Sequence, residues 1–385
     1  MNRSFARLWT AAFCSETGEW MLQVALPVLV YQSTGSAAST AAMMIVGMVP
    51  AVVLSPVAGV LADRADRRLL LLLVCLGQAV VALPLLVVDG AGWYLVMAAQ
   101  AALAAVFEPA RTALVPALVA PERVTAANGM LASAGNVARL AGAWLGGLLF
   151  ALGGIGLVVG GYVVVLLAAA GALVVPFGDR GRAPADRRPA VREWLDGLNL
   201  IRRNRRLWVV GAAMVLMAAA QGMFLVLFVP FVLDVLRAGP EGVGLLRGVQ
   251  AVGGLLAGLG IAVLARRVSP TQMYGWGAVT FGVVSAVGWH AHGFGAGLGV
   301  YVGLFVLVGV PSVVAATGLV STLQRAVPPA AVGRLTSTAF AAIALGTAAG
   351  MLIAGWTATW PPILDVQAAG YLVGGALVLI GENGR

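Results

Sequence analysis

Three polar side chains share one face of the first long apolar stretch, residues 8–31. Glu16, Glu19 and Gln23 follow one another at intervals of three and four residues. This spacing puts side chains on one side of a helix. A carboxyl in apolar surroundings can gain or lose a proton, because burial disfavours its charge while a nearby cation favours it. The spacing therefore predicts a helix face that lines a hydrated cavity.

Arg139 is the basic counterpart of these carboxyls in the sequence. It lies about 12 residues into the stretch 127–150, and Glu19 lies about 11 residues into the first stretch, so both reach a depth of roughly 16–18 Å along a helix. A charge at that depth in a bilayer costs at least ~2.5–3.5 kcal/mol unless it has a partner or contacts water. We predict that Glu19 carries an exchangeable proton, assisted by Glu16 and tuned by Arg139. The alternative is a fixed pair between Arg139 and one glutamate, which would only anchor two helices.

Glutamines in other apolar stretches could extend this cavity. We place Gln23, Gln100 and Gln221 in it, with Gln250 as a further contact. Taken singly, each could instead make a hydrogen bond between two helices.

The composition is that of a membrane protein. The chain has 385 residues, of which 61% are hydrophobic and 10% are charged, and its mean hydropathy is +0.96. A helix needs about 20 apolar residues to cross the hydrocarbon core. Twelve stretches are long enough: 8–31, 38–62, 69–88, 93–115, 127–150, 155–177, 207–232, 243–265, 271–289, 294–319, 335–356 and 362–381. The prediction is an all-α membrane protein with an N-terminal half (1–177), an Arg-rich linker (178–206) and a C-terminal half (207–385).

Arginines set the predicted orientation. With the N-terminus in the cytoplasm, all of the 24 arginines except Arg139, Arg237 and Arg247 fall in cytoplasmic segments. An excess of basic residues in short cytoplasmic loops is the rule in membrane proteins. Both termini are therefore predicted to be cytoplasmic, and the linker could also contact the lipid surface.

Glycine pairs four residues apart predict where helices approach closely. The pairs are Gly142/Gly146, Gly254/Gly258 and Gly346/Gly350. Small residues at this spacing let two helix backbones come together.

The sequence lacks the residues and motifs that several classes of function require. The basic side chains form no face with interleaved aromatic residues, so no nucleic acid is expected. No phosphate-binding Gly-rich motif is present, which argues against an ATP-driven pump. Cys14 and Cys75 lie inside apolar stretches and are interpreted as packing residues, and His290 and His292 as loop residues. We expect no catalytic residues, metal or cofactor, and hence no enzyme.

A charge cluster between two apolar stretches, from Gly59 to Arg68, resembles the loop between the second and third helices of major facilitator superfamily transporters. Further segments are similar to the branch that contains enterobactin exporters and macrolide efflux proteins. They are Ala25 to Pro27, Tyr31 to Ser36, Pro109 to Pro116, Ala127-Asn128, Arg139 to Gly147, and Leu323 to Arg334. Three positions depart from the family pattern: Asp66 and Ala138 stand where Gly is usual, and Ala143 stands where Pro is usual.

The resemblance implies two six-helix halves and a transport function. It implies that Asp63, Arg64, Arg67, Glu108 and Arg111 form a gate at the cytoplasmic side. The alternative for these charges is a solvated run that only sets orientation. The implied function is proton-coupled efflux of an amphipathic small molecule by a monomer in a bacterial plasma membrane. A lipid or lysophospholipid translocator, a uniporter and a transport-inactive receptor are the alternatives.

Overall fold

The computed structural model describes residues 3–177, 205–264, 267–326, 329–356 and 361–383. Within these ranges the regular structure is helical, with no strand. The predicted linker lies outside the described ranges, except for Arg205 and Arg206. The prediction of an all-α fold is confirmed.

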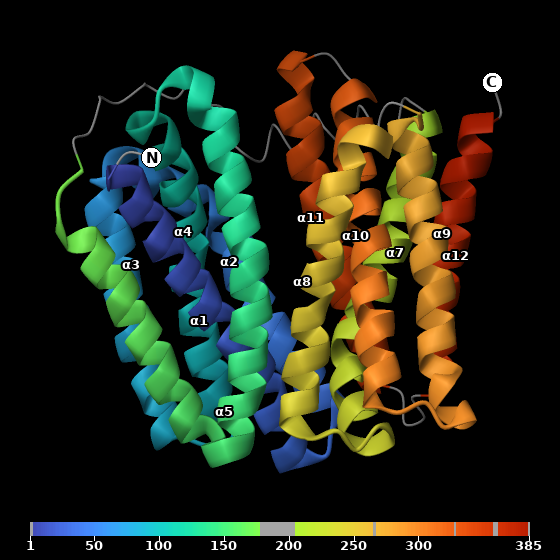
Figure 1. Ribbon diagram of the computed structural model, residues 1–385, viewed down its shortest axis with the longest axis horizontal. Helices are drawn as coiled ribbons and strands as arrows, with labels where there is room; N and C mark the ends of the chain where they lie inside the picture. The colour runs from blue at the N-terminus through green and yellow to red at the C-terminus, as the bar shows by residue number, and fades with distance from the viewer. Residues whose placement is uncertain (1–2, 178–204, 265–266, 327–328, 357–360, 384–385) are drawn as a thin grey trace. The chain divides into compact units, whose positions relative to one another are not determined.

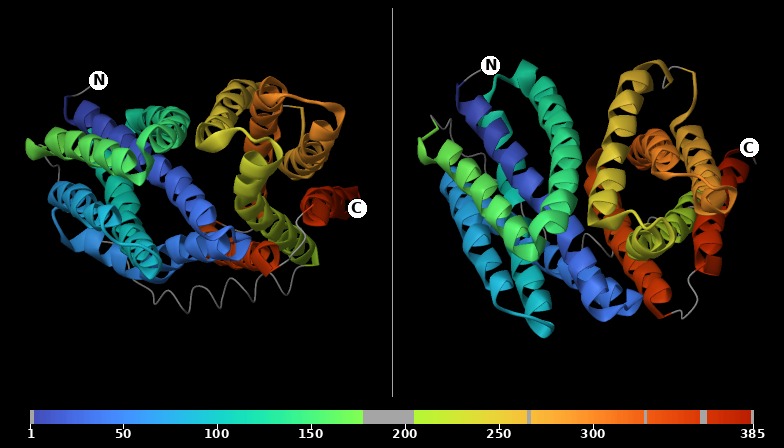
Figure 2. Two further views of the ribbon diagram at one scale, coloured as in Figure 1. Left: turned by 90° about the horizontal axis from the view of Figure 1, so that it is seen from below. Right: turned by 60° about the horizontal axis from the view of Figure 1, so that its bottom comes forward.

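The helices form two compact units. The first contains α1, most of α2, α3, α4, α5 and the start of α8 up to Gly248. Its complete helices are α1 (Arg3–Thr34), α3 (Arg67–Ala82), α4 (Ala91–Leu118) and α5 (Val124–Val174), and α2 spans Ala37–Arg64. Within this unit α1 packs along α5, and α3 packs against α4 and α5 (Figures 1 and 2). The predicted first half, residues 1–177, differs from this unit at the start of α2 and the start of α8.

Helix α5 is two helices joined by a bend. Its backbone leaves the helical region at Gly153 and Gly154, between the predicted stretches 127–150 and 155–177. Figure 1 shows the two arms meeting at the lower end of the first unit. Gly154 has a φ of 62° and a ψ of −156°, a conformation that only glycine adopts without strain.

We expect Gly154→Val to destabilise the protein by about 1–3 kcal/mol, because a β-branched residue is strained at this φ. Thermal unfolding of the detergent-solubilised protein measures the effect. Gly156→Val is the matched control, since an added Cβ at Gly156 would meet no described atom within 4 Å. Equal unfolding temperatures for the two variants would show that the bend does not need glycine.

Glycines also bring α1 and α5 together. A Cβ on Gly142 would lie 2.9 Å from Cβ of Trp20, and one on Gly146 would lie 2.8 Å from Cα of Met21. In the second unit, a Cβ on Gly350 would lie 2.8 Å from Cα of Ala219. The predicted close approach is thus confirmed for Gly142/Gly146 and Gly346/Gly350. It is wrong for Gly258, where an added Cβ would meet no described atom within 4 Å.

The second unit contains the rest of α8 and five further helices. The five are α7 (Arg205–Pro230), α9 (Pro270–His290), α10 (Leu298–Ala326), α11 (Pro329–Trp356) and α12 (Pro361–Asn383), and α8 spans Gly239–Leu264. The start of α2, up to Ala42, also belongs to this unit. A π-helical turn, Phe231–Val235, follows α7. Here α9 packs against α10 and α12, and α7 packs against α11 and α12. The core includes Phe281 and Tyr371, whose ring centroids are 4.4 Å apart.

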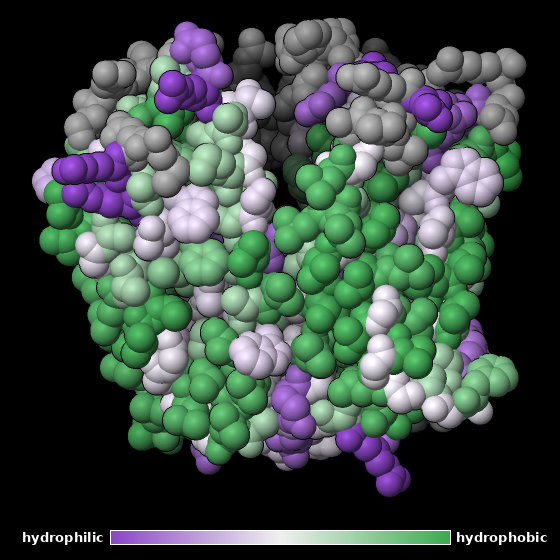
Figure 3. Space-filling model, viewed as in Figure 1, coloured by the Kyte–Doolittle hydropathy of each residue, from purple (hydrophilic) through white to green (hydrophobic). Residues whose placement is uncertain are grey.

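Apolar side chains cover much of each unit's outer surface. Leu73, Leu259 and Leu345 are exposed by 56%, 81% and 69%. Figure 3 shows hydrophobic residues across the middle of the face in view. Nine helices of the described chain, with α5 counted once, are long and apolar enough to cross a membrane. Such a surface suits lipid rather than water, so this is a multi-pass membrane protein.

Candidate functional site

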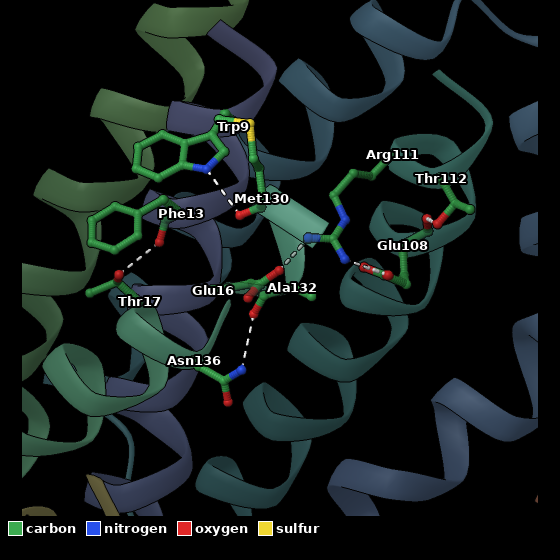
Figure 4. Close-up of polar contacts among 10 residues, drawn as sticks. All are labelled: Trp9, Phe13, Glu16, Thr17, Glu108, Arg111, Thr112, Met130, Ala132 and Asn136. Carbon is green, nitrogen blue, oxygen red and sulfur yellow. Dashed lines mark hydrogen bonds and ion pairs between the residues drawn. The ribbon is translucent and has the colours of Figure 1, made fainter. Parts of the chain in front are cut away.

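An ion-pair cluster joins α1 to α4. Arg111 of α4 pairs through Nη1 with Oε1 of Glu16 on α1, and its Nη2 lies 2.6 Å from Oε1 of Glu108, one turn earlier on α4 (Figure 4). The side chains of Arg111 and Glu16 are 14% and 22% exposed, whereas that of Glu108 is 60% exposed. Two carboxylates therefore share one guanidinium. Only the bond to Glu16 connects two helices.

Contacts with the first arm of α5 position α1 near the ion-pair cluster. Trp9 on α1 donates its indole N–H to the backbone oxygen of Met130 on the first arm of α5, at 3.2 Å. Gly135, five residues further along α5, leaves room for the carboxylate of Glu16. A side chain at Gly135 would displace that carboxylate, so the local sequence of α5 helps to position Glu16.

Glu19 lies on the same face of α1 as Glu16. Its side chain is exposed, and Oε1 accepts a hydrogen bond of 3.1 Å from Nε2 of Gln23. The predicted helical register of Glu16, Glu19 and Gln23 is therefore confirmed. Their predicted roles in proton coupling and in a substrate cavity stay predictions.

Arg139 lies beside an aromatic ring. Its Cζ is 5.0 Å from the ring centroid of Trp20, the residue after Glu19. Glu16 is paired with Arg111, and Gln23 is the hydrogen-bond partner of Glu19 within the described chain. Arg111 thus supplies the cation beside Glu16, and a pairing of Arg139 with one of these glutamates stays a prediction.

Two of the predicted cavity glutamines, one in each unit, connect helices of their own unit. Gln100 is buried, accepts a hydrogen bond of 3.0 Å from the hydroxyl of Tyr162, and donates one of 2.8 Å to the backbone oxygen of Gln78. Gln221 accepts a 2.7 Å hydrogen bond from the hydroxyl of Tyr371. These contacts match the alternative of interhelical hydrogen bonds. Gln250 is buried in the second unit.

The predicted gate is described only in part. The side chains of Asp63 and Arg64 lie outside the described part of the chain. Arg67 donates to the backbone oxygen of Ala113 at 3.1 Å, and Arg68 donates to that of Val174 at 2.6 Å. Arginines thus bind carbonyls near the C-terminal ends of α4 and α5, where helix dipoles favour positive charge. Arg111 pairs with Glu16 instead, and Glu108 bonds Arg111, which connects both residues to the α1 face.

Comparison with known proteins identifies the family. The model of the Major Facilitator Superfamily matches residues 8–239. The chain belongs to the major facilitator superfamily. Members of this superfamily are transporters rather than enzymes.

Curated relatives are transporters of the same superfamily. The chain is 26% identical over 388 residues to the uncharacterized MFS-type transporter YfiS of Bacillus subtilis (strain 168), an alignment that covers 95% of this chain and 89% of the relative. It is 28% identical over 300 residues to the multidrug efflux pump Tap of Mycolicibacterium fortuitum, with 72% and 71% covered.

Solved structures show the same fold at low sequence identity. A bacterial homologue of the iron transporter ferroportin, in an inward-facing state, matches with a TM-score of 0.77 at 18% identity, over 100% of this chain and 99% of that one. The nucleoside transporter NupG matches with a TM-score of 0.81 at 12% identity, over 98% and 99%. The major facilitator fold expected from the sequence is confirmed.

Proposed function

We propose that this protein is a proton-coupled exporter of an amphipathic small molecule that works by alternating access. The observation that carries the proposal is the face of α1 on which exposed Glu19 lies one turn from Glu16, with Glu16 paired to Arg111. Ionisable groups inside membrane helices mark ion or substrate pathways by default. Similarity to a multidrug efflux pump supports export.

The guanidinium of Arg111, which two carboxylates share, suggests how binding of a proton changes the contact between α1 and α4. Arg111 bonds Glu16 on α1 and Glu108 on its own helix. Protonation of Glu16 removes the charge that holds Arg111 across the helix boundary, while Glu108 keeps its bond within α4. A proton would therefore release α1 from α4, which is the kind of two-state contact that a transport cycle needs. Glu19, whose hydrogen bond in the described part of the chain is to Gln23 on the same helix, is our candidate for the proton carrier.

Flux into proteoliposomes tests the function against its alternatives. We would follow 1-naphthalenesulfonate, (1-naphthylmethyl)trimethylammonium and a fluorescent lysophospholipid, each with and without an imposed pH gradient. Accumulation of a naphthalene probe only with the gradient supports the proposal. Equal flux without the gradient would indicate a uniporter, movement of the lysophospholipid alone would indicate a lipid translocator, and no flux of any probe would indicate a receptor.

The gate and the two halves complete the proposal. Asp63, Arg64 and Arg67 would bias the cytoplasmic side toward closure, and residues 1–177 and 207–385 would be the moving halves, joined by the linker 178–206. We propose that the protein acts as a monomer in the plasma membrane of a bacterial cell, with both termini cytoplasmic.

Cysteine labelling tests the orientation. In a Cys14→Ala, Cys75→Ala background, we expect Thr34→Cys to react with an impermeant maleimide added to intact cells, because Thr34 ends α1 on the predicted outer side. Ala65→Cys, between α2 and α3, should react only after the cells are permeabilised. The opposite labelling pattern would overturn the orientation.

A further inference from the structure

We infer that Trp20, Arg139 and Arg247 form a binding site for the oxyanion group of an amphipathic substrate. The inference rests on the proposed export function and names the class of molecule exported. The class is an anion, with a carboxylate, sulfonate or phosphate group next to a planar apolar part.

Two guanidinium groups contact one indole ring. Cζ of Arg139 is 5.0 Å from the ring centroid of Trp20, and Cζ of Arg247 is 5.9 Å from it. The residues come from α1, the first arm of α5 and the start of α8, all in the first unit. A cation inside an apolar helix costs at least ~2.5–3.5 kcal/mol, so a position that gathers two of them is a functional candidate.

Glycine contacts hold these three segments in place. A Cβ on Gly142 would lie 2.9 Å from Cβ of Trp20, so α5 lies directly against α1 at the base of this side chain. A Cβ on Gly147 would lie 2.9 Å from Cα of Gly244, and one on Gly248 would lie 3.4 Å from Cα of Leu140. Arg139 and Arg247 therefore extend from backbones that touch, so their approach to Trp20 is set by helix packing.

The chemistry of the three side chains selects an anion. A guanidinium carries five N–H donors in its own plane, in a fork that suits a bidentate oxyanion. Charge-assisted hydrogen bonds of this kind are about twice as strong as neutral ones. The indole provides an apolar surface for the planar part of the ligand. A cationic ligand would meet two like charges.

The anion site and the carboxyl face are separate on α1. Trp20 follows Glu19 directly, so the two side chains leave the helix about 100° apart. Arg111 bonds Glu16 and Glu108, whereas Arg139 and Arg247 contact the ring. The carboxyl that would carry the proton and the site that would bind the anion thus lie on neighbouring faces of one helix.

Equilibrium binding to the full-length protein in lipid nanodiscs tests the site. The probes share one ring system and differ in charge: 1-naphthalenesulfonate, 1-naphthalenemethanol and (1-naphthylmethyl)trimethylammonium. Binding to protein-free nanodiscs is subtracted. We expect the sulfonate to bind at least about tenfold more tightly than the alcohol, and more tightly than the ammonium.

Variants assign this preference to the three residues. Arg139→Gln and Arg247→Gln should each weaken sulfonate binding about tenfold and leave alcohol binding unchanged. Trp20→Leu should weaken both. The matched controls are Arg123→Gln and Trp144→Leu, which change exposed residues outside the site and should bind like the wild type. If a Gln variant is not monodisperse, Arg139→Lys and Arg247→Lys keep the charge but lose the bidentate fork, and they should still weaken sulfonate binding.

Three results would overturn the inference: alcohol or ammonium binding as tight as that of the sulfonate, Gln variants that keep the full preference, or no binding of any probe. The proposed function fails separately. Gradient-driven export of the ammonium probe would overturn the anion site and leave proton-coupled export standing. If sulfonate binding needs both arginines but sulfonate flux is the same with and without the pH gradient, the anion site stands and proton-coupled export is overturned.

Discussion

Glu19→Gln is expected to abolish gradient-driven accumulation of 1-naphthalenesulfonate in proteoliposomes, with a loss of at least about tenfold, while exchange of labelled for unlabelled probe continues. Glutamine mimics the protonated carboxyl, so the variant can change conformation but cannot release a proton. Its amide oxygen can still accept the hydrogen bond that Glu19 accepts from Gln23. Uphill uptake and exchange, measured on the same vesicles, separate coupling from transport.

The control for this variant is Glu122→Gln, which neutralises an exposed carboxyl between α4 and α5. It should accumulate the probe like the wild type. Uphill transport by Glu19→Gln at the wild-type rate would show that the coupling site is elsewhere, and Glu16 would become the next candidate.

Arg111→Ala is expected to destabilise the protein by ~3 kcal/mol, because it leaves the largely buried carboxylate of Glu16 without its cation. The double variant Glu16→Gln, Arg111→Gln removes both charges and should regain most of that stability while still failing to transport uphill. Thermal unfolding in detergent, together with gradient-driven uptake, measures the two effects.

Glu108→Gln serves as the control for Arg111, because its carboxylate is mostly exposed and its bond to Arg111 lies within one helix. Exposed pairs contribute ~1 kcal/mol or less, so this variant should lose little stability. A double variant as unstable as Arg111→Ala would mean that Arg111 supports the fold through its packing and not through Glu16.

Local spacing predicted the features that depend on a single helix. The intervals between Glu16, Glu19 and Gln23 gave their shared face, and the break between residues 150 and 155 predicted the bend at Gly153 and Gly154. Both follow from helix periodicity and length, which the sequence contains directly.

Contacts between side chains of different helices could not be predicted from spacing in the same way. Counting residues gave Glu19 and Arg139 a similar depth, but depth does not give the direction in which a side chain leaves its helix. Arg139 lies beside Trp20, and the cation beside Glu16 is Arg111, for which the family resemblance implied a place in the cytoplasmic gate.

Two further contacts were missed because their residues are far apart in sequence. Arg247 reaches Trp20, and Nε2 of His290 lies 2.8 Å from Oδ1 of Asp365 between α9 and α12. Arg247 carried a usable signal, since it is one of the arginines inside an apolar stretch. His290 carried none, because only the packing of α9 on α12 brings Asp365 near.

Proton movement driven by substrate alone tests the central claim most directly. Proteoliposomes loaded with 1-naphthalenesulfonate and an impermeant pH dye are diluted into probe-free buffer, with potassium and valinomycin present to hold the membrane potential at zero. The sulfonate is a permanent anion and carries no proton across the bilayer by itself. Proton-coupled export predicts that the lumen acidifies as the probe leaves, and that Glu19→Gln vesicles lose this signal. Probe efflux from wild-type vesicles at constant luminal pH would contradict the account.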